Sequence, residues 1–135
     1  MPFILDCSVA LTWVMPDEDN DHADTLLDRL LSDSAVVPEL WPLEVSNVLL
    51  VAQRRKRIEE DEITRAIGAL RTLPIEVDFK THEYAFGDTL EYALKFGLTI
   101  YDAAYLELSL RRNLPLATLD KGLIKACTAA GIETL

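Results

Sequence analysis

The sequence predicts an α/β domain of three layers, in which a parallel sheet of four or five short strands is flanked by helices. Short apolar runs, of the length of buried strands, alternate with longer segments whose apolar residues recur at helical spacing. Helical connections between successive strands are typical of a parallel sheet. The chain has 135 residues, half of them hydrophobic, so we expect residues 1–135 to form a single domain with one core.

Four segments are predicted to be strands, because each is a short apolar run that ends at a charged, turn or proline residue. The first run is followed directly by Asp6, and Pro38 closes the second. The four segments are Phe3–Leu5, Ala35–Val37, Ile75–Val77 and Leu114–Thr118. A last short strand is expected over Ile132–Thr134.

Seven segments are predicted to be helices from their apolar periodicity. Their ends support this, because Pro42 suits a first turn, Gly97 and Gly131 suit helix C-termini, and the basic run 54–57 suits a negative helix end. The segments are Ser8–Met15, Asp21–Leu31, Trp41–Arg55, Glu59–Leu73, Thr81–Phe96, Ile100–Arg112 and Lys121–Ala130.

The formal net charge of −10 argues against broad, non-specific nucleic-acid binding, which needs a basic surface. It leaves room for a local basic patch or for bridging by metal cations, and it favours a basic partner. No apolar run approaches the length of about 18 residues that a membrane span needs. The first residues lack the pattern of a signal peptide, so we expect a cytoplasmic protein without a membrane contact. Cys7 and Cys127 are expected to be reduced thiols.

The sequence lacks the motifs of several common kinds of active site. It contains no nucleophile-elbow motif G-x-S-x-G, no P-loop and no dinucleotide-binding G-x-G-x-x-G. The two histidines, His22 and His82, stand in polar contexts at helix starts and are interpreted as surface residues. The chemistry that remains is that of carboxylates.

Four acids occupy one kind of position. Asp6 and Asp120 each follow a strand and precede a helix, while Glu44 and Asp102 lie in the first turns of two other helices. In an α/β sheet, the carboxyl ends of the strands and the N-termini of the helices lie on one edge, and that edge binds ligands. We therefore expect these four side chains to meet.

Each of these acids also has an ordinary structural interpretation. An acid at a helix start can cap the helix or complement its dipole, with a contribution of about 0.5–2 kcal/mol. The pattern Thr99-x-x-Asp102 is a capping box in its own right. Four acids at one rim, however, repel one another, and helix dipoles compensate that repulsion poorly. A hard divalent cation such as Mg²⁺ or Mn²⁺ compensates it well, because it prefers carboxylate oxygens.

Two hydroxyl groups stand beside these acids. Ser8 comes two residues after Asp6, and Thr118 comes two residues before Asp120. Each hydroxyl can hydrogen-bond a carboxylate or a metal-bound water and so orient the ligands of a metal. The alternatives are that Ser8 caps a helix and that Thr118 reflects only the preference of threonine for strands.

Four blocks in chain order carry a family resemblance; they are Phe3–Ser8, Pro42–Leu49, Leu98–Leu108 and Leu116–Lys121. With these blocks the chain resembles a PIN domain and is most similar to the VapC-type toxins of bacterial and archaeal toxin–antitoxin pairs. The resemblance implies a parallel sheet flanked by helices and metal-dependent cleavage of single-stranded RNA. It also implies assembly into homodimers and inhibition by a small antitoxin protein. It assigns the catalytic, metal-binding acids to Asp6, Glu44, Asp102 and Asp120.

The resulting hypothesis is hydrolysis of RNA phosphodiester bonds by water that one or two Mg²⁺ or Mn²⁺ ions activate. Two dications would neutralise four carboxylates, so an anionic phosphate could approach despite the overall charge. Lys121, beside Asp120, is a candidate phosphate contact, and Arg54 and Arg55 are further candidate RNA contacts or simply a solvated helix end. The helix faces 45–52 and 63–70 are interpreted as core, or as a dimer face or antitoxin groove.

Other functions are compatible with parts of the pattern. The same fold could be a catalytically weak scaffold that acts mainly through protein partners, although the intact set of four acids counts against this. A phosphoryl-transfer enzyme with Asp6 as nucleophile would usually carry a second aspartate where Ser8 stands. A receiver domain would need adjacent acids after the first strand and a lysine that ends a late strand, and neither is clear in this sequence.

Overall fold

A computed structural model describes residues 1–135, and its centre is a sheet of four parallel strands in the order β3-β2-β1-β4. The strands are β1 (Phe3–Leu5), β2 (Ala35–Pro38), β3 (Ile75–Asp78) and β4 (Leu116–Ala117). Every residue of β1 is fully buried, because β1 has a neighbouring strand on each side and helices on both faces. This central position determines where Asp6, the next residue, lies.

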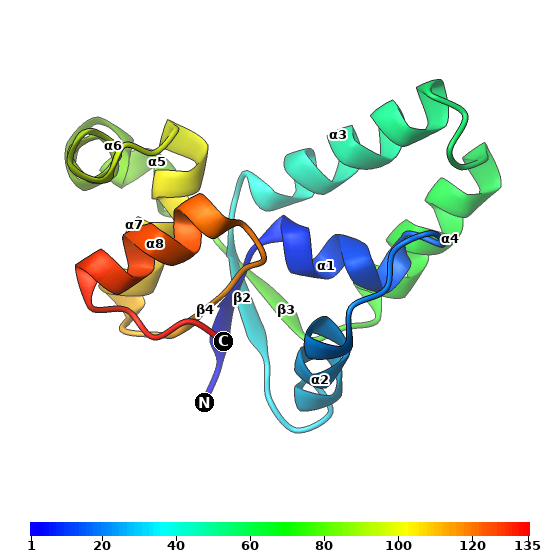
Figure 1. Ribbon diagram of the computed structural model, residues 1–135, viewed down its shortest axis with the longest axis horizontal. Helices are drawn as coiled ribbons and strands as arrows, with labels where there is room; N and C mark the ends of the chain where they lie inside the picture. The colour runs from blue at the N-terminus through cyan, green and yellow to red at the C-terminus, as the bar shows by residue number, and fades with distance from the viewer.

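Helices cover both faces of the sheet, which confirms the predicted three-layer α/β fold (Figure 1). The first layer packs around α1, and the second packs around α7, which contacts β1, β2 and β4. The first layer contains α1 (Cys7–Val14), α2 (Asp21–Arg29), α3 (Trp41–Arg54) and α4 (Glu60–Arg71). The second contains α5 (Thr81–Tyr84), the π-helical turn η1 (Ala85–Thr89), α6 (Leu90–Phe96), α7 (Ile100–Arg112) and α8 (Lys121–Ala130).

One cluster of 27 buried apolar residues includes side chains of the sheet and of both helix layers, so the layers share a single core. The strands supply the middle of this core, because β1 and β2 are buried along their whole length. None of the helices is both long enough and apolar enough to cross a lipid bilayer.

Three of the predicted elements differ from the structure. The single helix predicted over residues 81–96 is wrong: α5, η1 and α6 replace it, and the backbone leaves helical geometry at Gly87, with φ −114° and ψ −109°. Glycine tolerates such a conformation because it has no Cβ. The fourth strand is shorter than predicted, and its last expected residue, Thr118, lies beyond it. No fifth strand forms, since Thr134 makes only an isolated bridge with Leu116.

Candidate active site

Asp6 lies at the carboxyl end of the central strand, and only 5% of it is exposed. It occupies the residue before α1, yet its side chain makes no capping bond to that helix. Its Oδ2 atom instead accepts a hydrogen bond of 2.6 Å from the Thr118 hydroxyl and one of 2.8 Å from the Ser8 hydroxyl. The helix-cap interpretation is therefore wrong for Asp6. Both hydroxyl bonds go to Oδ2, which leaves Oδ1 for a ligand.

The two hydroxyls are themselves held by the loop between β4 and α8. The Leu119 N–H donates to the Ser8 hydroxyl at 3.0 Å, and the Asp120 N–H donates to the Thr118 hydroxyl at 3.0 Å. Each hydroxyl therefore accepts from the loop backbone and donates to Asp6, which fixes the direction of its proton. This network ties the end of β1 to the loop that carries Asp120.

Asp120 and Asp102 stand at the starts of α8 and α7. The Asp120 Oδ1 atom accepts a hydrogen bond of 3.0 Å from the Leu123 N–H, so this acid does cap its helix. At the other helix, the Thr99 hydroxyl accepts from the Asp102 N–H at 3.1 Å. Burial raises the pKa of Asp102, and the charges of Asp120 and Asp6 raise it further. These effects indicate that the three carboxylates lie within electrostatic range of one another.

Glu44 approaches the same edge from the first turn of α3. The hydroxyl of Tyr105, a fully buried residue of α7, donates a hydrogen bond to its Oε1 atom. Burial raises the pKa of Glu44 to about 6, and the charges of Asp6 and Asp102 add to the rise, while the bond from Tyr105 opposes it. Tyr105 was not among the predicted site residues. Its spacing of three residues from Asp102, which puts both on one helix face, was the signal that could have identified it.

The charges of these four acids have no cationic side chain to balance them, since none of the ion pairs in the molecule includes any of the four. Burial and the charges of the neighbouring acids also raise the pKa of the Cys7 thiol, which keeps it protonated. Oxygen donors with uncompensated negative charge suit a hard divalent cation. The residues present therefore fit Mg²⁺ or Mn²⁺.

The four carboxylates do not form a tight cage. Only Asp19, Asp21 and Asp24, which are exposed around the start of α2, bring three ligand atoms within 4.8 Å of one another. Such exposed acid groups are common without an ion. A looser arrangement still fits Mg²⁺, because this ion keeps several waters and is often bound through only one or two carboxylates.

The predicted RNA contacts lie at different distances from these acids. Lys121 is the first residue of α8 and is exposed directly beside Asp120. Arg54 and Arg55 lie at the opposite end of α3 from Glu44, about 15 Å away along the helix axis. The structure therefore brings Lys121 to the acids and leaves the two arginines apart from them.

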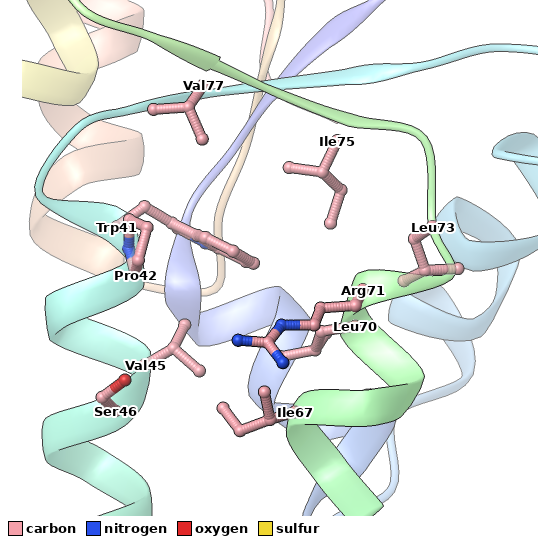
Figure 2. Close-up of a pocket in the computed structure, with 10 residues that line it drawn as sticks. All are labelled: Trp41, Pro42, Val45, Ser46, Ile67, Leu70, Arg71, Leu73, Ile75 and Val77. Carbon is pink, nitrogen blue, oxygen red and sulfur yellow. The ribbon is translucent and has the colours of Figure 1, made fainter.

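A different part of the surface carries an apolar hollow of about 360 Å³, between α3, α4 and β3. Figure 2 shows side chains of the two helices pointing toward each other below the strand, with Trp41 and Val45 on one side and Ile67 and Leu70 on the other. The indole N–H of Trp41 is buried there without a hydrogen-bond acceptor. None of the four acids lines this hollow.

Comparisons with known proteins agree on one family. A family model described as "PIN domain" matches residues 3–128. Ribonuclease VapC3 of Pyrobaculum aerophilum is 30% identical over 125 residues, which are 91% of this chain and 92% of that protein. Its name describes that protein as a ribonuclease.

Two solved structures share the fold. PAE2754 from Pyrobaculum aerophilum has 22% identity and a TM-score of 0.69, over 99% of this chain and 92% of that one. FitAcB from Neisseria gonorrhoeae has 18% identity and a TM-score of 0.59, over 100% of this chain and 96% of that one. At these identities the likeness concerns the fold alone.

Proposed function

Because the chain belongs to the PIN domain family, we propose that it is an endoribonuclease that hydrolyses RNA phosphodiester bonds and acts as the toxin of a toxin–antitoxin pair. One observation carries the chemical part of this proposal. The charges of four carboxylates at one edge of the sheet act on one another without an ion pair to a cation, and Asp6 is oriented by two hydroxyls instead of capping its helix. We include in the proposal that residues 1–135 form one domain, as their shared core suggests.

The proposed activity depends on Mg²⁺ or Mn²⁺. Asp6, Asp102 and Asp120 would hold one or two ions, with Glu44 as a further ligand. A bound ion of this kind lowers the pKa of a water molecule and stabilises the negative charge that develops on the phosphate and the leaving oxygen. The side chains of the protein bind and orient the metal and the RNA.

Each of those side chains has a task that follows from its contacts. Ser8 and Thr118 both donate to the Oδ2 atom of Asp6 and so hold this carboxylate in one orientation. Tyr105 plays the same part for Glu44. Lys121, next to Asp120, places a positive charge where an RNA phosphate must approach.

The proposed partners are RNA, a small antitoxin protein and a second copy of the chain, and the proposed location is the cytoplasm. The apolar hollow between α3 and α4 supports an antitoxin that binds through apolar side chains (Figure 2). A homodimer is supported by large apolar side chains that lie exposed on two helical segments. They are Leu43 and Leu50 on α3, and Phe86, Leu90 and Leu94 on η1 and α6. Exposed apolar residues that form a contiguous patch are typical of protein–protein contacts.

The test uses protein purified without its antitoxin, mixed structured and single-stranded RNAs, and Mg²⁺ or Mn²⁺. We expect the wild type to cleave RNA, and we expect EDTA, Asp6→Asn or Asp102→Asn to abolish cleavage while circular dichroism remains that of a folded protein. The matched control is Asp61→Asn, which removes one exposed carboxylate of α4 and should leave cleavage unchanged.

Cleavage that survives EDTA or either of the two site substitutions would refute the metal site. A folded wild type that cleaves none of many RNAs would favour the scaffold function over the enzyme. The thermal shift supplies a second readout: Mg²⁺ should raise the melting temperature of the wild type and not that of Asp6→Asn, since a ligand stabilises only the form that binds it.

A further inference from the structure

A second hollow, of about 420 Å³, lies between the end of α6 and the side of α8 that runs from Gly122 to Ala129. One wall comes from Lys95, Phe96 and Gly97, and the other includes Gly122 and Lys125. The two helices lie on the same side of the sheet in Figure 1, where α8 is orange and α6 is olive. We call this hollow the α6–α8 groove.

Both walls of the α6–α8 groove lead to acids of the proposed active site. Gly122 lies two residues after Asp120, and a Cβ atom added at Gly122 would stand 3.2 Å from the Asp120 Oδ1 atom. On the other wall, Leu98 directly precedes Thr99, which caps the helix of Asp102. One end of the groove therefore lies close to the acid cluster.

The groove carries two positively charged side chains that form no ion pair. Lys95 and Lys125 are both exposed, and neither takes part in an ion pair. The Lys95 ammonium lies 5.3 Å from the centre of the Phe96 ring, close enough for a cation–π interaction that keeps it at the groove. In a chain of net charge −10, two free lysines beside an acid cluster mark the approach that a polyanion can use.

We infer that the α6–α8 groove binds the sugar–phosphate backbone of RNA next to the cleavage site, with Lys95 and Lys125 each contacting a phosphate. This inference rests on the proposed ribonuclease function and adds the path of the substrate. Contacts of this kind position the strand without reading its sequence. They also make binding depend on salt, because each neutralised phosphate releases counterions.

The experiment measures the binding of a fluorescein-labelled single-stranded RNA by anisotropy, with Mg²⁺ present, over a series of salt concentrations. The variants are Lys95→Gln, Lys125→Gln and the double variant, each in the Asp6→Asn background so that the probe stays intact. Glutamine has nearly the helix propensity of lysine, so the fold should be kept. We expect the slope of log affinity against log salt to fall by about 0.7 for each lysine removed.

The matched control is Arg65→Gln on α4, which removes one exposed positive charge from the other helix layer. It should leave the salt slope unchanged, and Lys95→Arg with Lys125→Arg should retain it. In the cleavage-competent protein, the double glutamine variant should raise KM several-fold and leave kcat nearly unchanged, since the lysines bind substrate and do not touch the reacting atoms.

Each of the following outcomes would overturn the inference. An unchanged salt slope in the double variant excludes the groove as the RNA path, and an equal loss in Arg65→Gln assigns the effect to net charge. A double variant that binds RNA normally but loses its antitoxin assigns the groove to the protein partner. If the wild type cleaves RNA and the double variant keeps the salt slope, only the inference about the groove is refuted. If the wild type neither binds nor cleaves RNA, the proposed function is refuted as well.

Discussion

Two clusters of carboxylates lie along α7, one near each end of the helix, and their surroundings are opposite. The cluster at the start of the helix contains Asp102 with its three partner acids, and no cation pairs with it. The cluster at the end contains the buried acids Asp78 and Glu107, and Arg111 donates two hydrogen bonds to each of them, at distances of 2.6 to 3.1 Å. The pKa of Asp102 is raised, whereas hydrogen bonds from arginine hold that of Asp78 below its usual value against the effect of burial.

The difference separates acids that maintain the fold from acids that are available for chemistry. The Arg111 guanidinium, which also lies 4.6 Å from the centre of the Tyr84 ring, fills the space between β3 and α7 and satisfies its carboxylates completely. The acids at the start of the helix keep oxygens unpaired and charge uncompensated. We refer to them as the open cluster and to Asp78, Glu107 and Arg111 as the paired cluster. Removing Arg111 from the paired cluster should therefore destabilise the protein. Removing a side chain that orients the open cluster should instead lower its activity.

The largest effect is expected for Arg111→Leu, which breaks the paired cluster. It leaves the nearly inaccessible Glu107 carboxylate without a partner, and Asp78 keeps only the 3.4 Å contact with Arg112 and the hydrogen bond from the Lys80 N–H. Loss of one member of a buried pair costs about 3–5 kcal/mol of unfolding free energy. Urea denaturation should show this loss, while the cleavage rate per folded molecule changes little.

The control is Arg112→Leu, since Arg112 ends the same helix but pairs mainly with the exposed Glu76 at 2.8 Å. A partly exposed pair of this kind contributes about 0–1 kcal/mol. Equal destabilisation by the two substitutions would mean that the paired cluster is no more than a set of surface contacts. The double variant Arg111→Leu with Glu107→Leu should recover part of the lost stability, because it no longer leaves Glu107 charged and buried.

A smaller effect, on activity, is expected for Thr118→Val in the open cluster. Valine keeps the shape of threonine but removes the hydrogen bond to Asp6 and the acceptor for the Asp120 N–H. Groups that orient metal ligands typically change metal affinity or activity by about 10–100-fold. We expect a loss of this size in cleavage rate, with a higher Mg²⁺ concentration at half activity.

Thr118→Ser should restore most of the rate, because it returns the hydroxyl. Thr128→Val is the matched control, since its hydroxyl donates only to the carbonyl of Ile124 on the exposed side of α8. If Thr118→Val kept the wild-type Mg²⁺ dependence, the hydroxyl would serve stability alone and the open cluster would not depend on it.

Most of the fold could be predicted from the sequence, because buried strands and amphipathic helices leave local patterns. The bounds of β1 and α7 were predicted correctly, and the family and three-layer architecture are confirmed. The break at Gly87 could not be predicted, because one glycine in an otherwise helical segment is usually tolerated. The fourth strand is short because it pairs with β1 only through Ile4 and Leu5, and this pairing joins distant parts of the chain.

The positions of the acids were easier to predict than their partners. Strand ends and helix starts are visible in the sequence, so the four acids could be named, and their role as metal ligands stays a prediction. The pairing of Arg111 with Asp78 was not visible, because it joins a helix end to a strand 33 positions away. Arg111 and Arg112 do form a basic end of α7, and nothing in the sequence distinguishes Arg111, which binds two buried acids, from its neighbour.

The smallest effect is expected on stability at low pH, and it tests the role of Asp78 in the paired cluster. The charged groups that face Asp78 are Arg111 and Arg112, with Glu107 and Glu76 behind them as partners of those arginines. Because the pKa of Asp78 is lower in the folded than in the unfolded state, the folded protein holds this proton less tightly. Its contribution to stability is therefore complete above the unfolded pKa of about 4 and is lost as the pH falls through the folded pKa.

Urea denaturation of wild type and Asp78→Asn over a series of pH values measures this contribution. The wild type should be the more stable of the two at neutral pH, and the difference should shrink as the pH falls below about 4, since both proteins then carry a neutral side chain at this position. Asp17→Asn is the control, because Asp17 pairs with Arg57 on the exposed surface and should give a much smaller difference at neutral pH. If the difference in unfolding free energy between wild type and Asp78→Asn stayed constant with pH, Asp78 would contribute through its shape and not through its charge. The contrast between the paired and open clusters would then rest on Glu107 alone.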